Sequence, residues 1–220
     1  MFSKNTLQQT DEFAVHYDEY ISKTSWYGPQ MLFGLLYEYI QKDENLLDLG
    51  IGTGLSSLPF EKAGMRIYGV DGSEEMIRIC RDKGFTEDIR QADLVDFKSP
   101  YGVAVFDHVI SQGVFHLIGH LETVFKEVAR SLRKGGTFSF TYDEFNPDQP
   151  SDFQRETEEG VFSKANEDSG ILAFQHSREY FLNLVEHHDM KIIRETEFLA
   201  YRDTSSGREY YFSVLIAEKI

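Results

Sequence analysis

A glycine-rich turn directly after a short apolar run constrains the fold of this chain most strongly. Residues 45–49 predict a buried strand, and the sequence DLGIGTG, at residues 48–54, leads into a helix predicted over residues 55–63. Glycines at a strand-to-helix junction permit a tight turn, and the first N–H groups of the helix lack partners within it. We therefore expect a turn that binds a polar ligand, within an α/β fold.

Strand-like and helix-like segments alternate along the rest of the chain, which is typical of a sheet with helices on both faces. A turn at residues 203–207 joins the last two strands as a hairpin, so one strand near the edge of a parallel sheet should run antiparallel. The further strands are predicted at 66–70, 86–90, 103–110, 137–142, 191–199 and 210–218. The further helices are predicted at 31–41, 74–83, 121–132 and 178–187, with Gly135 and Gly136 terminating the third of these.

The length of 220 residues suits one α/β domain. We divide it into an aromatic helical leader, a cofactor-binding core, a polar insertion broken by prolines and glycines, and a final helix and hairpin, at residues 1–44, 45–142, 143–177 and 178–220. Long polar segments of this kind are often lids, and the insertion is predicted to have little core of its own. The aromatic leader either packs on the sheet or folds over the ligand.

Charge and composition exclude several classes of partner. The net charge of −15 opposes the field of nucleic-acid phosphates and of anionic lipid surfaces. No run approaches the ~20 apolar residues that cross a bilayer, and residues 1–13 do not read as a signal peptide, so a cytoplasmic protein is expected. Cys80 is the only cysteine, which rules out an internal disulfide and a thiolate metal cluster.

Two further acids help to define the ligand. A dinucleotide fingerprint usually has the spacing G-x-G-x-x-G, whereas this turn has G-x-G-x-G, which better suits a nucleoside without phosphate. Asp71 ends the second predicted strand, where a carboxylate can accept hydrogen bonds from both ribose hydroxyls. Asp71 or Ser73 could instead cap the next helix, and Asp93, after the third strand, could be an ordinary loop acid.

Five motifs follow one another in order between residues 45 and 142. They are Asp48-x-Gly50-x-Gly52-x-Gly54, Val70-Asp71-Gly72-Ser73-x-x-Met76, Ala92-Asp93-Leu94, Phe106-Asp107-x-Val109-Ile110-Ser111 and Leu132-x-Lys134-Gly135-Gly136. Together they resemble the class I S-adenosylmethionine-dependent methyltransferases, in the branch of small-molecule and uncharacterised members. The resemblance implies a Rossmann-like seven-stranded sheet of order 3-2-1-4-5-7-6 with the seventh strand antiparallel.

The resemblance also implies S-adenosyl-L-methionine as cofactor, S-adenosyl-L-homocysteine as product, and no metal. Asp48 would orient the turn and the ammonium group of the cofactor. Tyr17, in the Tyr-Asp pair of the leader, would lie near the methionine moiety. The remaining roles would fall to Gly50, Gly52 and Gly54 against the methionine moiety, Asp71 on the ribose, Gly72 and Met76 beside adenine, Asp93 and Leu94 at the adenine edge, and Ser111 and Gln112 at the methyl group.

A sulfonium methyl is already electrophilic, so the enzyme mainly positions the acceptor and, for some nucleophiles, removes a proton. His116 lies just past the carboxyl end of the fourth predicted strand, where open α/β sheets collect their ligands, and we expect it to accept that proton. A packing role is the alternative for His116, and Tyr142 and Asp143 are alternative contacts to the acceptor. We expect methyl transfer to an O or N atom of a small molecule by a monomer or homodimer; a non-catalytic cofactor-binding regulator and an NAD(P)-dependent oxidoreductase are the alternatives.

Overall fold

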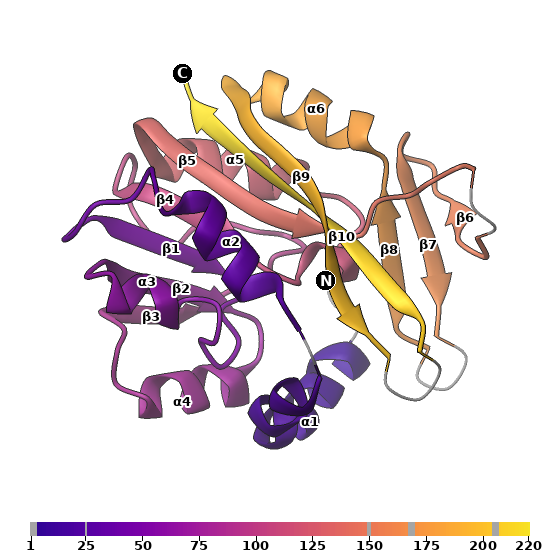
Figure 1. The fold of residues 1–220 in the computed structure, drawn as a ribbon, viewed down its shortest axis with the longest axis horizontal. Coiled ribbons are helices and arrows are strands. Elements are labelled where there is room, and N and C mark those ends of the chain that lie inside the picture. The colour runs from indigo at the N-terminus through magenta and orange to yellow at the C-terminus, as the bar shows by residue number, and fades with distance from the viewer. Residues whose placement is uncertain (1–3, 25, 149–150, 167–169, 204–206) are drawn as a thin grey trace.

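A seven-stranded mixed sheet forms the centre of the structure (Figure 1), a computed structural model that describes residues 4–24, 26–148, 151–166, 170–203 and 207–220. Its strand order is β3-β2-β1-β4-β5-β10-β9, and β10 alone runs antiparallel to both of its neighbours. The strands are β1 Asn45–Leu49, β2 Arg66–Asp71, β3 Asp88–Gln91, β4 Phe106–Ser111, β5 Leu132–Tyr142, β9 Met190–Arg202 and β10 Glu209–Lys219. The predicted order 3-2-1-4-5-7-6 with a reversed seventh strand is confirmed.

Helices cover both faces of this sheet, as predicted; in Figure 1, α2 lies in front of the sheet and α5 behind it. Buried side chains of α2, α3 and α4, such as Leu32, Phe60 and Ile77, pack on one face. Phe125 of α5 and Phe181 of α6 pack on the other. The helices are α1 Lys4–Lys23, α2 Gly28–Leu36, α3 Leu58–Lys62, α4 Glu74–Asp82, α5 Glu122–Ser131 and α6 Arg178–His187, with a 3-10 turn, η1, at Phe115–Leu117.

Two predicted helices are shorter in the structure than the apolar pattern suggested. The helix expected over 31–41 ends at Leu36. Tyr39 and Ile40, which follow it, still pack on the same core, and this explains why the apolar pattern continues past the helix. The helix expected from residue 55 begins at Leu58. Starting there places Pro59 in the first turn, where its missing N–H breaks no helical hydrogen bond.

The boundaries around β4 and β5 also differ from prediction. Strand β4 begins at Phe106, because Ala104 has a positive φ and its N–H bonds to Arg130 at the end of α5. Helix α5 ends at Ser131, since Leu132 already pairs with Phe106 as part of β5. Gly135 and Gly136 therefore lie within a strand and do not end the helix.

The polar insertion contains a small sheet, contrary to the expectation of little core. Its antiparallel strands are β6 Gln154–Arg155, β7 Val161–Ala165 and β8 Leu172–His176, which lie beside the β9–β10 hairpin in Figure 1. Val161 and His176 are fully buried, and His176 Nε2 donates to the carbonyl of Gly119 at 3.0 Å. Buried contacts of this kind were not visible in a polar sequence. Pro150 and residues 204–206 of the predicted hairpin turn lie outside the described residues.

The leader forms α1, which lies against α4 at the lower edge of the molecule (Figure 1). Ala14 is buried in this contact, whereas Phe13 and Tyr20 stay exposed and touch edge to face. Helix α1 therefore covers the carboxyl ends of β1 and β2 and does not pack on the outer face of the sheet. Among the described residues, no helix has both the length and the apolar character needed to span a membrane.

Candidate functional site

The three glycines of the turn after β1 have different surroundings, although all have positive φ, between 53° and 88°. A Cβ at Gly50 would lie 2.5 Å from a methyl of Val114, and one at Gly54 would lie 2.5 Å from the ring of Phe85. A Cβ at Gly52 would meet nothing closer than 4.0 Å. Gly50 and Gly54 are thus required by packing, whereas Gly52 faces open space.

Asp71 holds the open side of this turn in place. Its Oδ2 accepts the N–H of Gly52 at 2.8 Å, and its Oδ1 accepts the N–H of Ser73 at 2.9 Å. Burial raises the pKa of this carboxyl, and backbone hydrogen bonds from Ser73, Gly52 and Gly72 oppose that rise. Ser73 Oγ accepts the N–H of Met76 at 3.1 Å, so Ser73 caps α4 and leaves the carboxylate of Asp71 on the turn.

Asp48 contributes a buried oxygen without a partner. The side chain is 1% exposed, and its Oδ2 accepts the hydroxyl of Ser57 at 2.7 Å. Its Oδ1 accepts no hydrogen bond from the residues that the structure describes, although buried polar atoms normally have one. Burial raises the pKa of Asp48 to about 7. A cationic or hydrogen-donating ligand would stabilise this carboxylate.

Carboxylates of α1 tie the leader to the turn. Asp18 accepts hydrogen bonds from Thr53 Oγ1 at 2.5 Å and from Lys83 Nζ at 2.6 Å. Asp11 accepts one from the hydroxyl of Ser73 at 2.5 Å. Sequence reasoning missed these contacts, and the Tyr-Asp pair of the leader was the only signal for Asp18.

Tyr17 of α1 is buried and lies within the field of both acids of the turn. Burial, followed by the charges of Asp18, Asp71 and Asp48, raises the pKa of the Tyr17 phenol to about 12. At the start of the loop after β2, a Cβ at Gly72 would be 3.0 Å from Leu7 of α1. Helix α1 thus covers the turn from outside.

Three other residues that were predicted to contact the cofactor have side chains that make contacts within the protein. Ser111 is fully buried and donates its hydroxyl to the carbonyl of Leu49 at 3.0 Å, so its side chain does not reach the expected methyl position. The side chain of Leu94 packs in the core of the sheet. Asp93 is half-buried and accepts the N–H of Val95 at 2.9 Å, which shapes the loop after β3.

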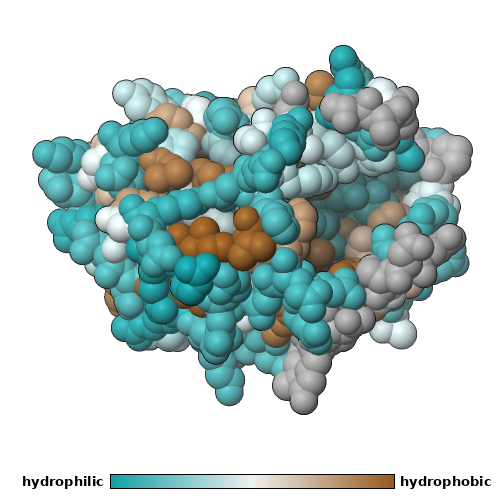
Figure 2. Space-filling view, turned by 90° about the horizontal axis from the view of Figure 1, so that it is seen from below, coloured by the Kyte–Doolittle hydropathy of each residue, from teal (hydrophilic) through white to brown (hydrophobic). Residues whose placement is uncertain are grey.

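A large pocket adjoins the turn, between α1 and the strands of the hairpin and insertion. Its volume is about 1080 Å³, and Figure 2 shows a hollow on the α1 side of the molecule with a mostly hydrophilic rim. Tyr17 and Gln112 line this pocket, so it meets the turn where the methionine end of the cofactor was predicted. Gln112 is 8% exposed, and within the described part of the chain neither its amide oxygen nor its amide nitrogen has a hydrogen-bond partner.

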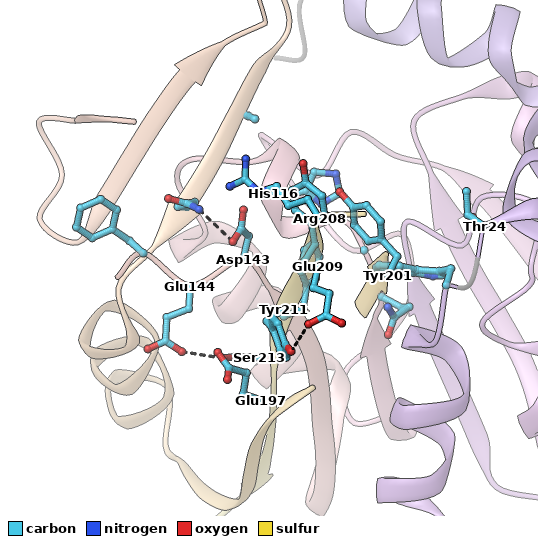
Figure 3. A pocket seen from close by; sticks show the side chains of 18 of the residues that line it. Thr24, His116, Asp143, Glu144, Glu197, Tyr201, Arg208, Glu209, Tyr211 and Ser213 are labelled. Carbon is cyan, nitrogen blue, oxygen red and sulfur yellow. Dashed lines mark hydrogen bonds between the residues drawn. The ribbon is translucent and has the colours of Figure 1, made fainter. Parts of the chain in front are cut away.

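His116, on η1, also points into the pocket (Figure 3). Its Nδ1 is enclosed and has no partner, and burial lowers the pKa of the ring to about 4. The imidazole is therefore neutral near pH 7, as expected. It is a weaker base than the sequence suggested, because burial disfavours the imidazolium.

The far side of the pocket is an aromatic wall, which we define as Trp26, Tyr201, Tyr210 and Phe212. The Trp26 ring centroid lies 6.0 Å from that of Tyr201 and 5.6 Å from that of Phe212, and the rings of Tyr201 and Tyr210 stack at 4.5 Å. These residues come from the leader and the final hairpin. Sequence reasoning noted the aromatic leader but did not connect it with the hairpin.

Of the two alternative acceptor contacts after β5, only Asp143 reaches the pocket. Its Oδ1 accepts the amide N–H of Gln175 at 3.1 Å, and burial raises its pKa to about 6. Tyr142 is fully buried, with its ring 4.2 Å from that of Phe181. The expectation for Tyr142 was wrong because consecutive strand residues point to opposite faces.

Comparison with known proteins identifies the family. A model of the methyltransferase domain matches residues 47–140. An uncharacterised methyltransferase of Bacillus cereus is 30% identical over 171 residues, covering 71% of this chain and 77% of that protein. The chain belongs to the class I S-adenosylmethionine-dependent methyltransferases. This family uses S-adenosylmethionine as methyl donor, in contrast to the NAD(P)-dependent oxidoreductases that were the alternative.

Other similarities to this methyltransferase are partial. A phosphatidylethanolamine N-methyltransferase of Cereibacter sphaeroides is 34% identical over 97 residues, which are 41% of this chain and 46% of that protein. The chain thus spans less than half of that enzyme. A solved S-adenosylmethionine-dependent methyltransferase of Methanosarcina mazei has the same fold, with a TM-score of 0.69, 20% identity, and coverage of 86% of this chain and 98% of that one.

Proposed function

We propose that this methyltransferase binds S-adenosylmethionine across the glycine turn and moves its methyl group to an O or N atom of a small molecule in the adjoining pocket. The observation that carries the proposal is the shared wall of the two sites. Tyr17 and Gln112, which the family resemblance assigns to the methionine end of the cofactor, also line the pocket. An acceptor in the pocket would therefore meet the cofactor at its reactive end.

The residues of the turn fit this cofactor. Gly52 leaves space above the backbone, and Asp48 offers a buried oxygen without a partner to the ammonium group. Asp71 takes the ribose hydroxyls, since a carboxylate has about four lone-pair sites and the backbone N–H groups of the turn do not use all of them. Gly72, Met76, Asp93 and Leu94 surround the adenine, the last through its backbone. When bound, the cofactor supplies an electrophilic methyl group on a sulfonium.

The pocket suits a small acceptor. Its volume of about 1080 Å³ lies just above the usual range for small-molecule sites, which reaches about 1,000 Å³. His116 accepts a hydrogen bond from the reacting O–H or N–H group and helps to remove its proton. Residues 143–177 cover the acceptor as a lid. The net charge of −15 disfavours nucleic-acid substrates, and we propose a cytoplasmic monomer or homodimer.

Calorimetry with S-adenosylhomocysteine tests the cofactor site. Replacing Asp71 with alanine removes charge-assisted hydrogen bonds to the ribose and should weaken binding by about 1.5–3 kcal/mol. The matched control is Glu87→Gln, which removes an exposed carboxylate before β3 and should bind normally. An unchanged affinity of Asp71→Ala for S-adenosylhomocysteine would show that Asp71 does not bind the ribose.

A methyl-transfer screen over small-molecule pools tests the reaction itself. Formation of S-adenosylhomocysteine is the readout, and it should depend on a component of the pool. Hydrogen exchange with cofactor and the acceptor found in this way should then show protection in residues 151–166, which belong to the proposed lid. Cofactor binding without turnover on any pool would identify a non-catalytic regulator.

A further inference from the structure

The charged side chains that line the pocket are mostly acidic. Both basic side chains already have partners: Lys164 pairs with Asp152, and the Arg208 guanidinium lies 4.9 Å from the centroid of the Tyr210 ring and acts with its charge on Asp143. The five acids of the lining are Asp143, Glu144, Asp152, Glu197 and Glu209, against the two bases Lys164 and Arg208. An anionic acceptor would enter against this field, whereas a cationic acceptor would be attracted by it.

Asp143 is the acid best placed to bind an acceptor. It follows β5 at the same edge of the sheet as His116, and Figure 3 shows both side chains pointing into the cavity. Its Oδ1 accepts the amide N–H of Gln175, and the positive charge of Arg208, from the same lining, acts on the carboxylate. Glu144, by contrast, accepts from Ser213 Oγ at 2.7 Å. Asp143 is therefore an acid of the pocket wall that a cationic ligand can share with Arg208.

The aromatic wall lines the same pocket as this carboxylate, since all four of its members and Asp143 belong to the lining. The charge of Asp143 is also one of the smaller causes that raise the pKa of the Tyr201 phenol, after burial, Tyr210 and Tyr20. Aromatic faces attract cations, and the guanidinium of Arg208 over Tyr210 is a cation held at this wall within the protein. A carboxylate beside ring faces is the combination that recognises an ammonium group.

Two neutral groups in the pocket could accept further N–H donors. Gln112 has an enclosed amide oxygen without a partner, and His116 has an enclosed ring nitrogen without one. The ring centroid of His116 lies 6.2 Å from that of Phe212, at the edge of the aromatic wall. A protonated amine carries several N–H donors, so a single group can satisfy both Asp143 and a neutral acceptor.

We propose that the methyl acceptor carries a cationic amine, whose ammonium group is held by Asp143 and the aromatic wall. This inference rests on the proposed function and names the substrate class of the same pocket. A neutral alcohol would bring no positive charge to a lining in which five acids face two bases. A carboxylate would be repelled by the acidic lining.

Three probes of nearly equal size and different charge test the inference: 2-phenylethylamine, 2-phenylethanol and 3-phenylpropionate. Calorimetry at pH 7.5 is run on the full chain with and without S-adenosylhomocysteine. The amine should bind about tenfold more tightly than the alcohol, from one charge-assisted hydrogen bond and one cation–π contact, and the acid should bind more weakly than the alcohol.

The isosteric variant Asp143→Asn should bring the amine to within about twofold of the alcohol, because it removes the counter-charge and keeps the shape of the side chain. Its affinity for S-adenosylhomocysteine should be unchanged, which shows that it is folded. The control Glu159→Gln removes a carboxylate of the insertion whose side chain is 94% exposed, outside the pocket lining, and should keep the preference for the amine.

Equal binding of the three probes, failure of the amine to bind, or a full amine preference in Asp143→Asn would each overturn the inference. Loss of S-adenosylhomocysteine binding by the unmodified protein would instead overturn the proposed function. The two failures are distinguishable, because the amine preference is also measured without S-adenosylhomocysteine.

Discussion

The two halves of the candidate site are built in different ways. The glycine-turn half comes from residues 48–76, a nearly continuous stretch at the ends of β1 and β2. The pocket half combines Trp26 of the leader, Gln112 and His116 after β4, Asp143 after β5, and the two strands of the final hairpin. The first half is a local motif, whereas the second is assembled only by the fold.

The halves also differ in how their polar groups are held. Asp71 accepts two backbone N–H groups, which fixes the carboxylate relative to the turn. In the pocket, Gln112 and the Nδ1 of His116 have no partner. A turn whose acid is fixed by backbone hydrogen bonds suits the cofactor. Pocket side chains without hydrogen-bond partners in the described residues are available to the methyl acceptor. Changes in the first half should alter cofactor affinity, and changes in the second should alter turnover.

The largest effect is expected for Asp48→Asn, measured as the free energy of unfolding against pH. The pKa of Asp48 is raised from 3.8 to about 7, so its contribution to stability is fully present below pH 3.8 and is lost as the pH rises towards 7. Asparagine does not ionise, and the variant should therefore gain stability over the wild type across that window, by on the order of 4 kcal/mol above pH 7.

The same variant should bind S-adenosylhomocysteine less tightly, because it loses the charge that faces the ammonium group. Glu87→Gln matches its change in net charge at an exposed position. Stability curves of Asp48→Asn and wild type that stay parallel between pH 4 and pH 7 would contradict the buried-carboxyl interpretation.

Gly50→Ala and Gly52→Ala form a matched pair within the turn. Both place alanine at a positive φ, which costs about 1–2 kcal/mol. Gly50→Ala adds a clash with Val114 and should lose about 3 kcal/mol of stability in chemical denaturation. Gly52→Ala should lose only the stability that the positive φ costs, but it should bind the cofactor more weakly. Equal losses of stability would show that Gly52 is also packed.

The variant His116→Ala tests the pocket half of the site. Assistance to proton removal is worth ~10²–10⁴ in rate, and a ring pKa of about 4 makes His116 a weak base, so we expect a loss of about 10² in turnover. The affinity for S-adenosylhomocysteine, measured by calorimetry, should stay within twofold. A simultaneous loss of stability and cofactor affinity would instead identify His116 as a packing residue.

The smallest effect is expected for Asp18→Asn, which loosens α1 from the turn. Asp18 is 41% exposed and pairs with Lys83, and such partly exposed pairs contribute up to about 1 kcal/mol. Binding of S-adenosylhomocysteine should weaken by less than about fivefold. The control Glu19→Gln removes the next acid of α1, which pairs only with Lys23 at the surface. Equal effects of the two variants on the affinity would show that the contact between α1 and the turn does not contribute to cofactor binding.

Much of the fold could be predicted from the sequence because the information is local. Strand and helix periods, the glycine turn and the acid that ends β2 all lie within short segments, and parallel strands bring their carboxyl ends to one edge. The sheet order followed from the family resemblance. The boundaries of α3 and β4 did not follow, because a proline in the first turn and a positive φ at Ala104 override the apolar pattern.

The sequence by itself therefore determined the methyltransferase fold and the positions of Gly52, Asp71 and Tyr17 around the turn. Only the tertiary structure decided which residues face the pocket. Tyr142 and Asp143 are neighbours in sequence, yet one is in the core and the other in the cavity. Trp26 and Phe212 are 186 residues apart and touch. The turn at residues 203–207 predicted that β9 and β10 pair, but such contacts also depend on how β10 pairs with β5, and no local pattern of residues encodes that pairing.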